Sequence, residues 1–125
     1  MKPNRNLYKA LCSFAIIAML FSCNSSKDEK FSKLRWNEQT DSAFPPPARP
    51  KIVGDLISNH KLVGLRYKEL VALLGLPDQS NSNSIIYQIS VDYGNDIDPI
   101  YTKDLVFTFS KDSLITKYKF DEWRK

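Results

Sequence analysis

An alternation of apolar and polar residues over Ile85–Tyr93 constrains the fold of this chain more than any other feature. Every odd position there is apolar or aromatic, whereas Gln88, Ser90 and Asp92 between them are polar. A period of two predicts a β-strand with one buried and one solvated face. Such a strand needs neighbouring strands and a covering layer to bury its apolar face. With 125 residues, the chain can form one small domain of this kind, but not a large enzyme with a deep interior.

Two amphipathic helices are predicted upstream of this strand. The first follows Pro50 and has apolar residues at i, i+1, i+4 and i+5, namely Ile52, Val53, Leu56 and Ile57. The second has them at i, i+3, i+4 and i+7, namely Tyr67, Leu70, Val71 and Leu74. Gly75 is typical of a left-handed helix cap and Pro77 prevents continuation. Arg66 stands where a capping box would have Ser or Thr, so the start of the helix is less well defined than its end.

Two further strands are predicted downstream, over Leu105–Ser110 and Leu114–Phe120, with a tight hairpin turn at residues 111–113. Residues 94–99 (GNDIDP) are typical of a loop. The predicted order is α-α-β-β-β. This is an α+β fold in which two short N-terminal helices pack on a three-stranded antiparallel sheet.

Residues 1–22 have the pattern of a lipoprotein signal peptide. Three basic residues precede an apolar run, Ala10–Phe21, that is shorter than the roughly 20 residues a membrane-spanning helix needs. The tetrapeptide that ends at Cys23, with Leu20 and Ser22, resembles a bacterial lipobox. The sequence therefore predicts diacylglycerol and palmitate-type acyl chains on Cys23, which together anchor a protein firmly. In the alternative, an ordinary secretory signal, Cys23 would remain as an unpaired thiol in an oxidising compartment.

The formal net charge of +4 overstates the charge of the mature chain. Lys2, Arg5 and Lys9 lie in the predicted signal peptide, so 15 basic residues remain against 14 acidic ones. A net charge of about +1 gives no indication of nucleic-acid binding.

The residues after Cys23 suggest a location. Lys27-Asp28-Glu29 resembles the export signal of lipoproteins from the Bacteroidetes lineage, which implies the outer leaflet of the outer membrane. The alternative is an ordinary charged linker. We expect a lipid-anchored outer-membrane protein, and whether it faces the cell surface or the periplasm stays open at this point.

Residues 23–48 are predicted to form a polar, proline-rich tether, and residues 49–125 the folded domain. Three consecutive prolines, residues 45–47, favour a semi-rigid polyproline II spacer. Phe31, Leu34 and Trp36 have helix-like spacing, and we expect them to pack on the domain rather than on lipid.

The stretch His60–Pro77, which closes with Leu-Gly-Leu-Pro, and the later hairpin Leu105–Ile115 resemble the SmpA/OmlA (BamE-like) lipoproteins. The resemblance covers about residues 49–120. It implies a non-enzymatic outer-membrane lipoprotein that is, in the best-known branch, an accessory of the machine that inserts β-barrel proteins. β-Lactamase-inhibitor proteins look similar in fold. The Gly94–Pro99 loop has no counterpart that we can match, and no partner-contacting residues carry over, so the resemblance indicates fold better than function.

Catalytic, metal and cofactor sites are not expected. His60 is the only histidine and lies just past a predicted helix end, where a ring can cap the last carbonyls. Nucleophilic catalysis needs a supported base and zinc needs several nitrogen or sulfur ligands, which the mature chain lacks. Four oxygen donors, Asp92, Asn95, Asp96 and Asp98, are compatible with calcium, but such residues are also typical turn formers. Calcium binding by this loop stays an open alternative.

Binding is therefore the expected activity. The sheet half of the chain is rich in aromatic residues, and Tyr101 and Trp123 stand outside its alternation, so we predict that these two contact a partner. The sequence favours a protein-binding or structural module in the envelope, with a possible accessory role in outer-membrane assembly. The alternative is a surface-exposed, receptor-like or inhibitor-like lipoprotein that binds an external protein, peptide or glycan.

Overall fold

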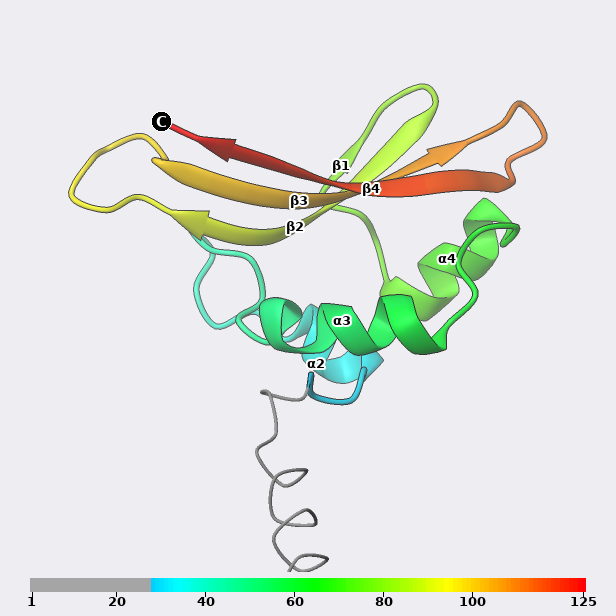
Figure 1. Ribbon diagram of the computed structural model, residues 1–125, viewed down its shortest axis with the longest axis horizontal. Coiled ribbons are helices and arrows are strands. Elements are labelled where there is room, and N and C mark those ends of the chain that lie inside the picture. Colours follow the sequence, from blue (N-terminus) through cyan, green and yellow to red (C-terminus); the bar gives the residue numbers. More distant parts are fainter. Residues whose placement is uncertain (1–27) are drawn as a thin grey trace, which may run out of the picture.

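The computed structural model of the chain describes residues 28–125. The signal peptide, the lipobox residues Leu20, Ser22 and Cys23, and Lys27 lie outside the described residues. The elements are α2 (Lys33–Asn37), α3 (Arg49–Asn59), α4 (Tyr67–Leu74), β1 (Gln79–Ser80), β2 (Ser84–Asp92), β3 (Tyr101–Phe109) and β4 (Ile115–Arg124). Figure 1 shows the helices gathered on one face of a sheet whose other face is open.

The sheet is antiparallel throughout, with the strand order β1-β2-β3-β4. The α+β class and the antiparallel sheet are confirmed. The predicted count was too low, because the described residues contain three helices and four strands rather than two and three. Both missed elements are short. α2 is a five-residue helix that buries only Trp36, so the helix-like spacing around it is too short to predict a separate element, and β1 consists of two exposed residues without a periodicity.

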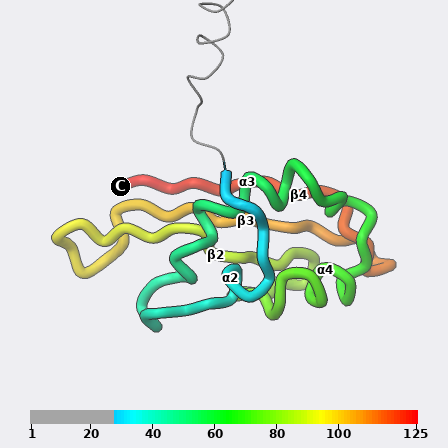
Figure 2. Tube along the Cα trace, turned by 90° about the horizontal axis from the view of Figure 1, so that it is seen from below, coloured from blue at the N-terminus to red at the C-terminus, as the bar shows by residue number. Residues whose placement is uncertain are grey.

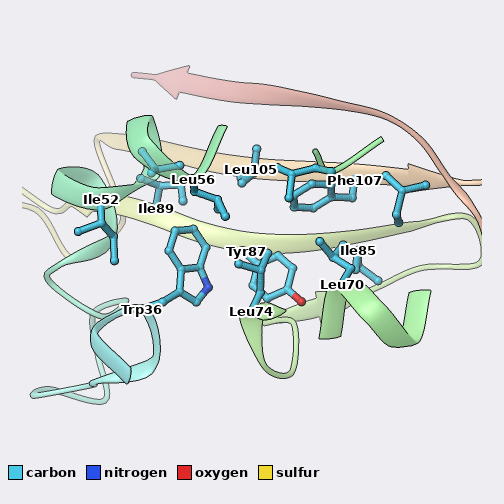
Figure 3. Close-up of a cluster of buried hydrophobic side chains, with 13 residues drawn as sticks. Trp36, Ile52, Leu56, Leu70, Leu74, Ile85, Tyr87, Ile89, Leu105 and Phe107 are labelled. Carbon is cyan, nitrogen blue, oxygen red and sulfur yellow. The ribbon is translucent and has the colours of Figure 1, made fainter. Parts of the chain in front are cut away.

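The core lies between the helices and the face of the sheet that they cover (Figure 3). β2 contributes Ile85, Tyr87 and Ile89, all essentially inaccessible to solvent, as the alternation predicts. A β-bulge between Gln88 and Ser90 then shifts the register against β3 and ends the strict alternation. Burial, the main cause, raises the pKa of Tyr87, so its hydroxyl stays protonated and donates a hydrogen bond to the Gly75 carbonyl at 2.8 Å.

Both predicted helices are confirmed. α3 buries Ile52, Val53 and Leu56, and α4 buries Leu70 and Leu74. α4 ends as predicted, because Gly75 has a φ of +87° and its N–H donates to the Val71 carbonyl at 2.7 Å. At the other end, Arg66 makes no side-chain cap hydrogen bond.

The described part of the predicted tether is folded, and this corrects the domain boundary. Trp36 is fully buried, and its ring packs against those of Phe31 and Tyr87. The Glu29 N–H donates to the Lys51 carbonyl at 3.0 Å. The chain therefore joins the domain at residue 28, about twenty residues before the predicted boundary at residue 49. The expected packing of Phe31 and Trp36 is confirmed, whereas Leu34 is 79% exposed.

The proline-rich segment also belongs to the domain rather than to a spacer. Pro46 is buried, and Phe44 makes an edge-to-face contact with Tyr93 at a ring separation of 5.6 Å. Its prolines and Phe44 line a shallow apolar groove beside the end of β2, together with Ile89 and Val91. The prolines thus shape a loop that covers this part of the sheet.

Arg49 is the buried charged residue that joins three separate segments. Its Nε donates to the Trp36 carbonyl at 2.9 Å. Its Nη1 donates to Asp78 Oδ2 at 2.6 Å and to the Gln88 carbonyl at 2.8 Å. The guanidinium also lies over the ring of Trp36, 5.0 Å from the centroid. This single side chain links α3 to the N-terminal segment and to the edge of β2.

The last two strands extend beyond their predicted limits. The turn at residues 111–113 is confirmed, with Ser113 at a φ of +61°. However, β3 begins at Tyr101 and β4 continues to Arg124, so the charged end of the chain is a paired strand rather than a solvated tail. These extensions pair with each other, from Tyr101–Arg124 to Asp104–Asp121. Neither extension has an apolar alternation that would have revealed it.

Candidate protein-binding surface

The face of the sheet that points away from the helices is covered by none of the described elements (Figure 1). We call it the open face. Its rows follow from the strand register, because directly paired residues point to the same side. The open face includes Ile86, Gln88, Thr102, Asp104, Val106, Thr108, Lys117, Lys119, Asp121 and Trp123, of which Val106 is only 9% exposed. It is a mixed polar and apolar surface with one large aromatic side chain, Trp123.

Tyr101 and Trp123, the two residues predicted to contact a partner, lie at the same end of the sheet but on opposite faces. Trp123 pairs with Thr102 on the open face and is 51% exposed. Tyr101 pairs with Arg124 on the helix side, where the guanidinium lies 4.8 Å from its ring centroid. The structure therefore leaves Trp123 available to a partner on the open face and partly covers Tyr101.

Asp104 lies in the middle of the open face and was not singled out by the sequence. Its register partner on β4 is Asp121, so two carboxylates are directly opposed. Burial raises the pKa of Asp104, and the charges of Asp121 and Asp78 add to this effect. One of its carboxylate oxygens is buried without a hydrogen-bond partner among the described residues. The open face thus carries negative charge at its centre, with Lys119 and Trp123 beside it.

The outer edge of β4 is the second exposed feature of the sheet. The start of the strand is covered, because the Ile115 N–H donates to the Leu65 carbonyl and the Gly64 N–H to the Ile115 carbonyl, both at 2.8 Å. Beyond this point β4 pairs only with β3 among the described strands. Figure 2 shows β4, in red, running along one edge of the domain. Unpaired edge groups of this kind are potential sites of strand addition.

The chain joins the domain on the side opposite the open face. The Phe31 N–H donates to Asp55 Oδ2 at 2.7 Å, and Asp28 lies against Gly54. Both contacts are on the outer surface of α3, because the residues that α3 buries toward the core are Arg49, Ile52, Val53 and Leu56. The first described residues therefore run beneath the helices, as Figure 1 shows, and the open face is turned away from them.

Two residues of the predicted export triplet take part in these contacts. Glu29 forms an ion pair with Arg35 at 2.6 Å, and Asp28 lies on α3. Lys27 lies outside the described residues. Acidic residues that pack on the domain have a structural role in addition to any role in export.

In the loop over residues 92–98, which was considered as a calcium site, two carboxylates form hydrogen bonds with neighbouring groups of the protein. Asp92 Oδ1 accepts a hydrogen bond from the Gly94 N–H, and Asp96 Oδ1 accepts one from the Ile97 N–H, each at 2.8 Å. Asp96 Oδ2 pairs with Lys125 Nζ at 2.8 Å, and this hydrogen bond is the main cause of the lowered pKa of Asp96. In residues 28–125, no three histidine, cysteine or acidic side chains are grouped so that they would hold a metal ion. The loop geometry fits the turn-forming alternative.

His60 lies directly after α3, where the sequence places it, but its ring has a different contact from the expected one. Its backbone N–H donates to the Leu56 carbonyl at 3.2 Å, whereas its ring meets Phe31 edge-on at 5.3 Å. Its Nδ1 is buried without a hydrogen-bond partner in the described part of the chain. The ring helps to hold the N-terminal segment on α3.

Comparisons with protein-family models, with curated proteins and with solved structures give no match to this chain. Within residues 28–125, none of the helices has the length and apolar character needed to span a membrane. The geometry of the open face and of the β4 edge is therefore the basis for a functional conclusion.

Proposed function

We propose that this chain is a lipid-anchored, non-enzymatic envelope lipoprotein whose open face binds another protein. The proposal rests on one observation, which is that the N-terminal segment and the open face lie on opposite sides of the domain. The chain joins the domain beneath the helices, and a sheet face with a half-exposed tryptophan is turned the other way. Antiparallel sheets commonly leave one face solvated and polar, and a large, half-exposed aromatic side chain on that face is of the type that anchors protein interfaces.

The proposed anchor lies close to the domain. If Cys23 carries lipid, five residue steps separate it from Asp28, where contacts with α3 begin. A fully extended chain covers at most about 3.6 Å per residue, so the connection spans no more than about 18 Å. This is much shorter than the tether predicted over residues 23–48. The domain would be held next to the membrane rather than at a distance from it.

A short connection also sets the orientation of the domain. The first described residues, from Asp28 to Phe31, pass over the outer surface of α3, so we expect the helices to face the membrane. Leu34 fits this arrangement. It precedes Trp36 by two positions on α2, and because helical residues two apart point in nearly opposite directions, burial of Trp36 turns Leu34 outward. An apolar side chain exposed on this side can contact lipid.

The open face would then point away from the membrane, where another protein can reach it. Trp123 supplies the kind of large aromatic anchor that is common at protein interfaces, and Asp104 and Asp121 supply negative charge. A partner with a basic or amide-rich surface complements this pattern. The proposal keeps the possible accessory role in outer-membrane assembly that the SmpA/OmlA resemblance implies, and it applies equally to a receptor-like protein that faces outward.

Photo-crosslinking in intact cells tests this proposal. A photoreactive amino acid in place of Trp123 should capture a defined protein other than a second copy of this chain, identified by mass spectrometry. The matched control is Ser58, which is also exposed but lies on α3, and the same label there should capture lipid or nothing. Capture of the same protein with equal yield from both positions, or of no protein from Trp123, would contradict binding at the open face.

Protease treatment of the same cells before lysis separates the two biological roles. Capture of barrel-insertion components by a protease-protected domain would support the assembly role. Capture of an external protein by a protease-sensitive domain would support the receptor-like role.

A third test addresses the anchor. Labelling of the protein with an alkyne analogue of palmitate should be lost in Cys23→Ser.

A further inference from the structure

The free edge of β4 has a charge pattern that is complementary to itself. Three charged residues of β4 point to the open face, with Lys117 and Lys119 on one side of Phe120 and Asp121 on the other. Charged side chains, especially Lys, are one of the devices by which exposed edge strands avoid pairing with a second strand. Here the sign changes at Phe120, so a two-fold axis at this residue places unlike charges opposite each other. We propose that two copies of this chain associate through antiparallel pairing of their β4 strands about Phe120.

The hydrogen-bonding geometry of the edge allows this pairing. The Lys125 N–H donates to the Ile100 carbonyl at 2.9 Å. Because hydrogen-bonded pairs alternate in an antiparallel ladder, odd-numbered residues 117–123 bond to β3 and the even-numbered ones point outward. The backbone groups of Tyr118, Phe120 and Glu122 therefore face away from the sheet. A second β4 centred on Phe120 would bond to all three.

Only one register satisfies the charges, the faces and the space available. Side chains keep their own face only if paired residue numbers have an even sum, since an odd sum would set the open face of one copy beside the helix side of the other. With Phe120 opposite Phe120, Lys119 lies opposite Asp121 twice, Lys117 opposite Trp123, and Tyr118 opposite Glu122. Lys117 would then form a cation–π contact.

The neighbouring registers are unfavourable. A shift by two residues in one direction sets Asp121 opposite Asp121. A shift by two in the other direction sets Lys119 opposite Lys119. It also brings Trp123 of the second copy, instead of only Lys125 beyond the end of β4, to Ile115, where Leu65 and Gly64 already bond to the edge. Like charges directly opposed across strands are destabilising. The covered start of β4 therefore limits the register on one side and charge repulsion limits it on the other.

The two edges of the sheet differ, because the edge along β2 is covered and most of the β4 edge is not. The opposite edge, along β2, is covered by β1, and beyond β1 by Asp78, which accepts a hydrogen bond from the Gln88 N–H at 2.8 Å. The Gln88 carbonyl accepts a hydrogen bond from Arg49 Nη1 at 2.8 Å. The same domain thus covers one edge of its sheet, whereas residues 118–124 at the other edge pair with β3 on one side and with no described strand on the outer side.

The resulting dimer is compatible with a membrane anchor. Pairing that keeps each face in register places both helix layers on the same side of the joined sheet, so both N-terminal segments emerge toward one membrane. The two open faces then form one continuous surface. The association does not depend on lipidation of Cys23, so its success or failure is independent of the proposed anchor.

A charge-swap experiment on the full-length protein, purified from membranes in detergent, tests the proposed pairing. Lys119→Asp and Asp121→Lys each set like charges opposite each other twice, and we expect the dimer dissociation constant to rise about tenfold, as sedimentation velocity would measure it. The double variant restores unlike pairs and should return to within about twofold of the original value. A monomeric parent protein would overturn the proposal. So would a double variant whose dimer dissociation constant is as high as those of the single variants. A melting temperature for each variant confirms that the monomer fold is retained.

Disulfide crosslinking tests the register. Phe120→Cys sets two thiols on the axis, about 5.5 Å apart at Cα, within the range for a disulfide. Tyr118→Cys and Glu122→Cys are matched controls, because their copies are displaced by four residues, about 13 Å along the strand. For Phe120→Cys we expect mass spectrometry to detect two copies of the same peptide joined by a disulfide, with no equivalent from either control. Equal crosslinking at all three positions, or a disulfide-linked complex with a different protein and no homodimer, would overturn it.

Discussion

Arg49 shows how one residue can organise a small domain whose core is limited. Its side chain is 2% exposed and serves a carbonyl of the N-terminal segment, a carbonyl of β2 and the carboxylate of Asp78. Asp78 itself remains partly exposed, which lowers the cost of removing the pair from water. The sequence gives no sign of this role, since Arg49 lies in a proline-rich stretch, at the start of a helix whose apolar pattern begins only at Ile52.

We expect Arg49→Ala to lower the free energy of unfolding by about 3 kcal/mol, because it leaves two buried carbonyls and a carboxylate without their donor. Urea denaturation of the purified protein measures this loss. Arg66→Ala is the matched control, since Arg66 is largely exposed and its 4.0 Å contact with Glu69 is worth little. Equal stabilities of the two variants would show that Arg49 does not join the segments as described.

Asp104 gives the open face a pH-dependent property. Its pKa is raised in the folded protein, mainly by burial, so the folded state binds this proton more tightly than the unfolded state does. The charged form therefore opposes folding at pH 7, and this effect disappears as the pH falls through the folded pKa toward the ordinary value of 3.8. Asp55 and Asp96 act in the opposite sense, because their pKa values are lowered and their contributions are lost in acid.

Asp104→Asn should therefore raise the melting temperature at pH 7, by about 1–3 °C, since it removes one of two opposed carboxylates. The difference from the parent protein should shrink as the pH falls through the raised pKa of Asp104 toward 3.8. Thermal denaturation across this range measures it, with Asp112→Asn in the exposed hairpin turn as a control. A variant that is less stable at pH 7 would indicate that Asp104 has a favourable partner instead.

The elements with a strong local pattern were predicted closely, and those held by distant contacts were not. α4 was predicted at its observed limits because its apolar spacing and the Gly75 cap act within ten residues. α2 is a single turn whose stability comes from the burial of Trp36 and from Asn37, whose side chain donates to the Leu74 carbonyl at 2.9 Å. Contacts across 37 residues leave no local signal, and the helix-like spacing of Phe31, Leu34 and Trp36 does not by itself distinguish a folded segment from a tether.

This difference can be measured with two fragments. Residues 28–125 should fold cooperatively, whereas residues 49–125, the predicted domain, should lack a cooperative unfolding transition. Removal of Trp36 alone from the core is worth about 3–5 kcal/mol, a large part of the stability of a domain of this size. Circular dichroism and thermal denaturation of both fragments test the expectation. A cooperative transition for residues 49–125 would restore the sequence-based boundary.

At the scale of the whole molecule, the functional surface was predicted only in part. Trp123 was identified because it is an aromatic residue outside the alternation, and the structure places it half-exposed on the open face. Tyr101 was identified for the same reason but is partly covered on the other face. The opposition of Asp104 and Asp121 and the free edge of β4 depend on strand order and register, and a single sequence does not contain these directly.

The central claim is that the domain stands with its helices toward the membrane and its open face away from it. Nitroxide spin labels on Leu34→Cys and Lys119→Cys test this claim in reconstituted membranes, through collision rates with lipid-soluble oxygen and with a water-soluble nickel chelate. We predict that the Leu34 label lies at the lipid surface, with a high ratio of oxygen to nickel collisions, and that the Lys119 label is fully aqueous. Equal ratios at both positions, or the reverse order, would contradict the orientation from which the binding function follows.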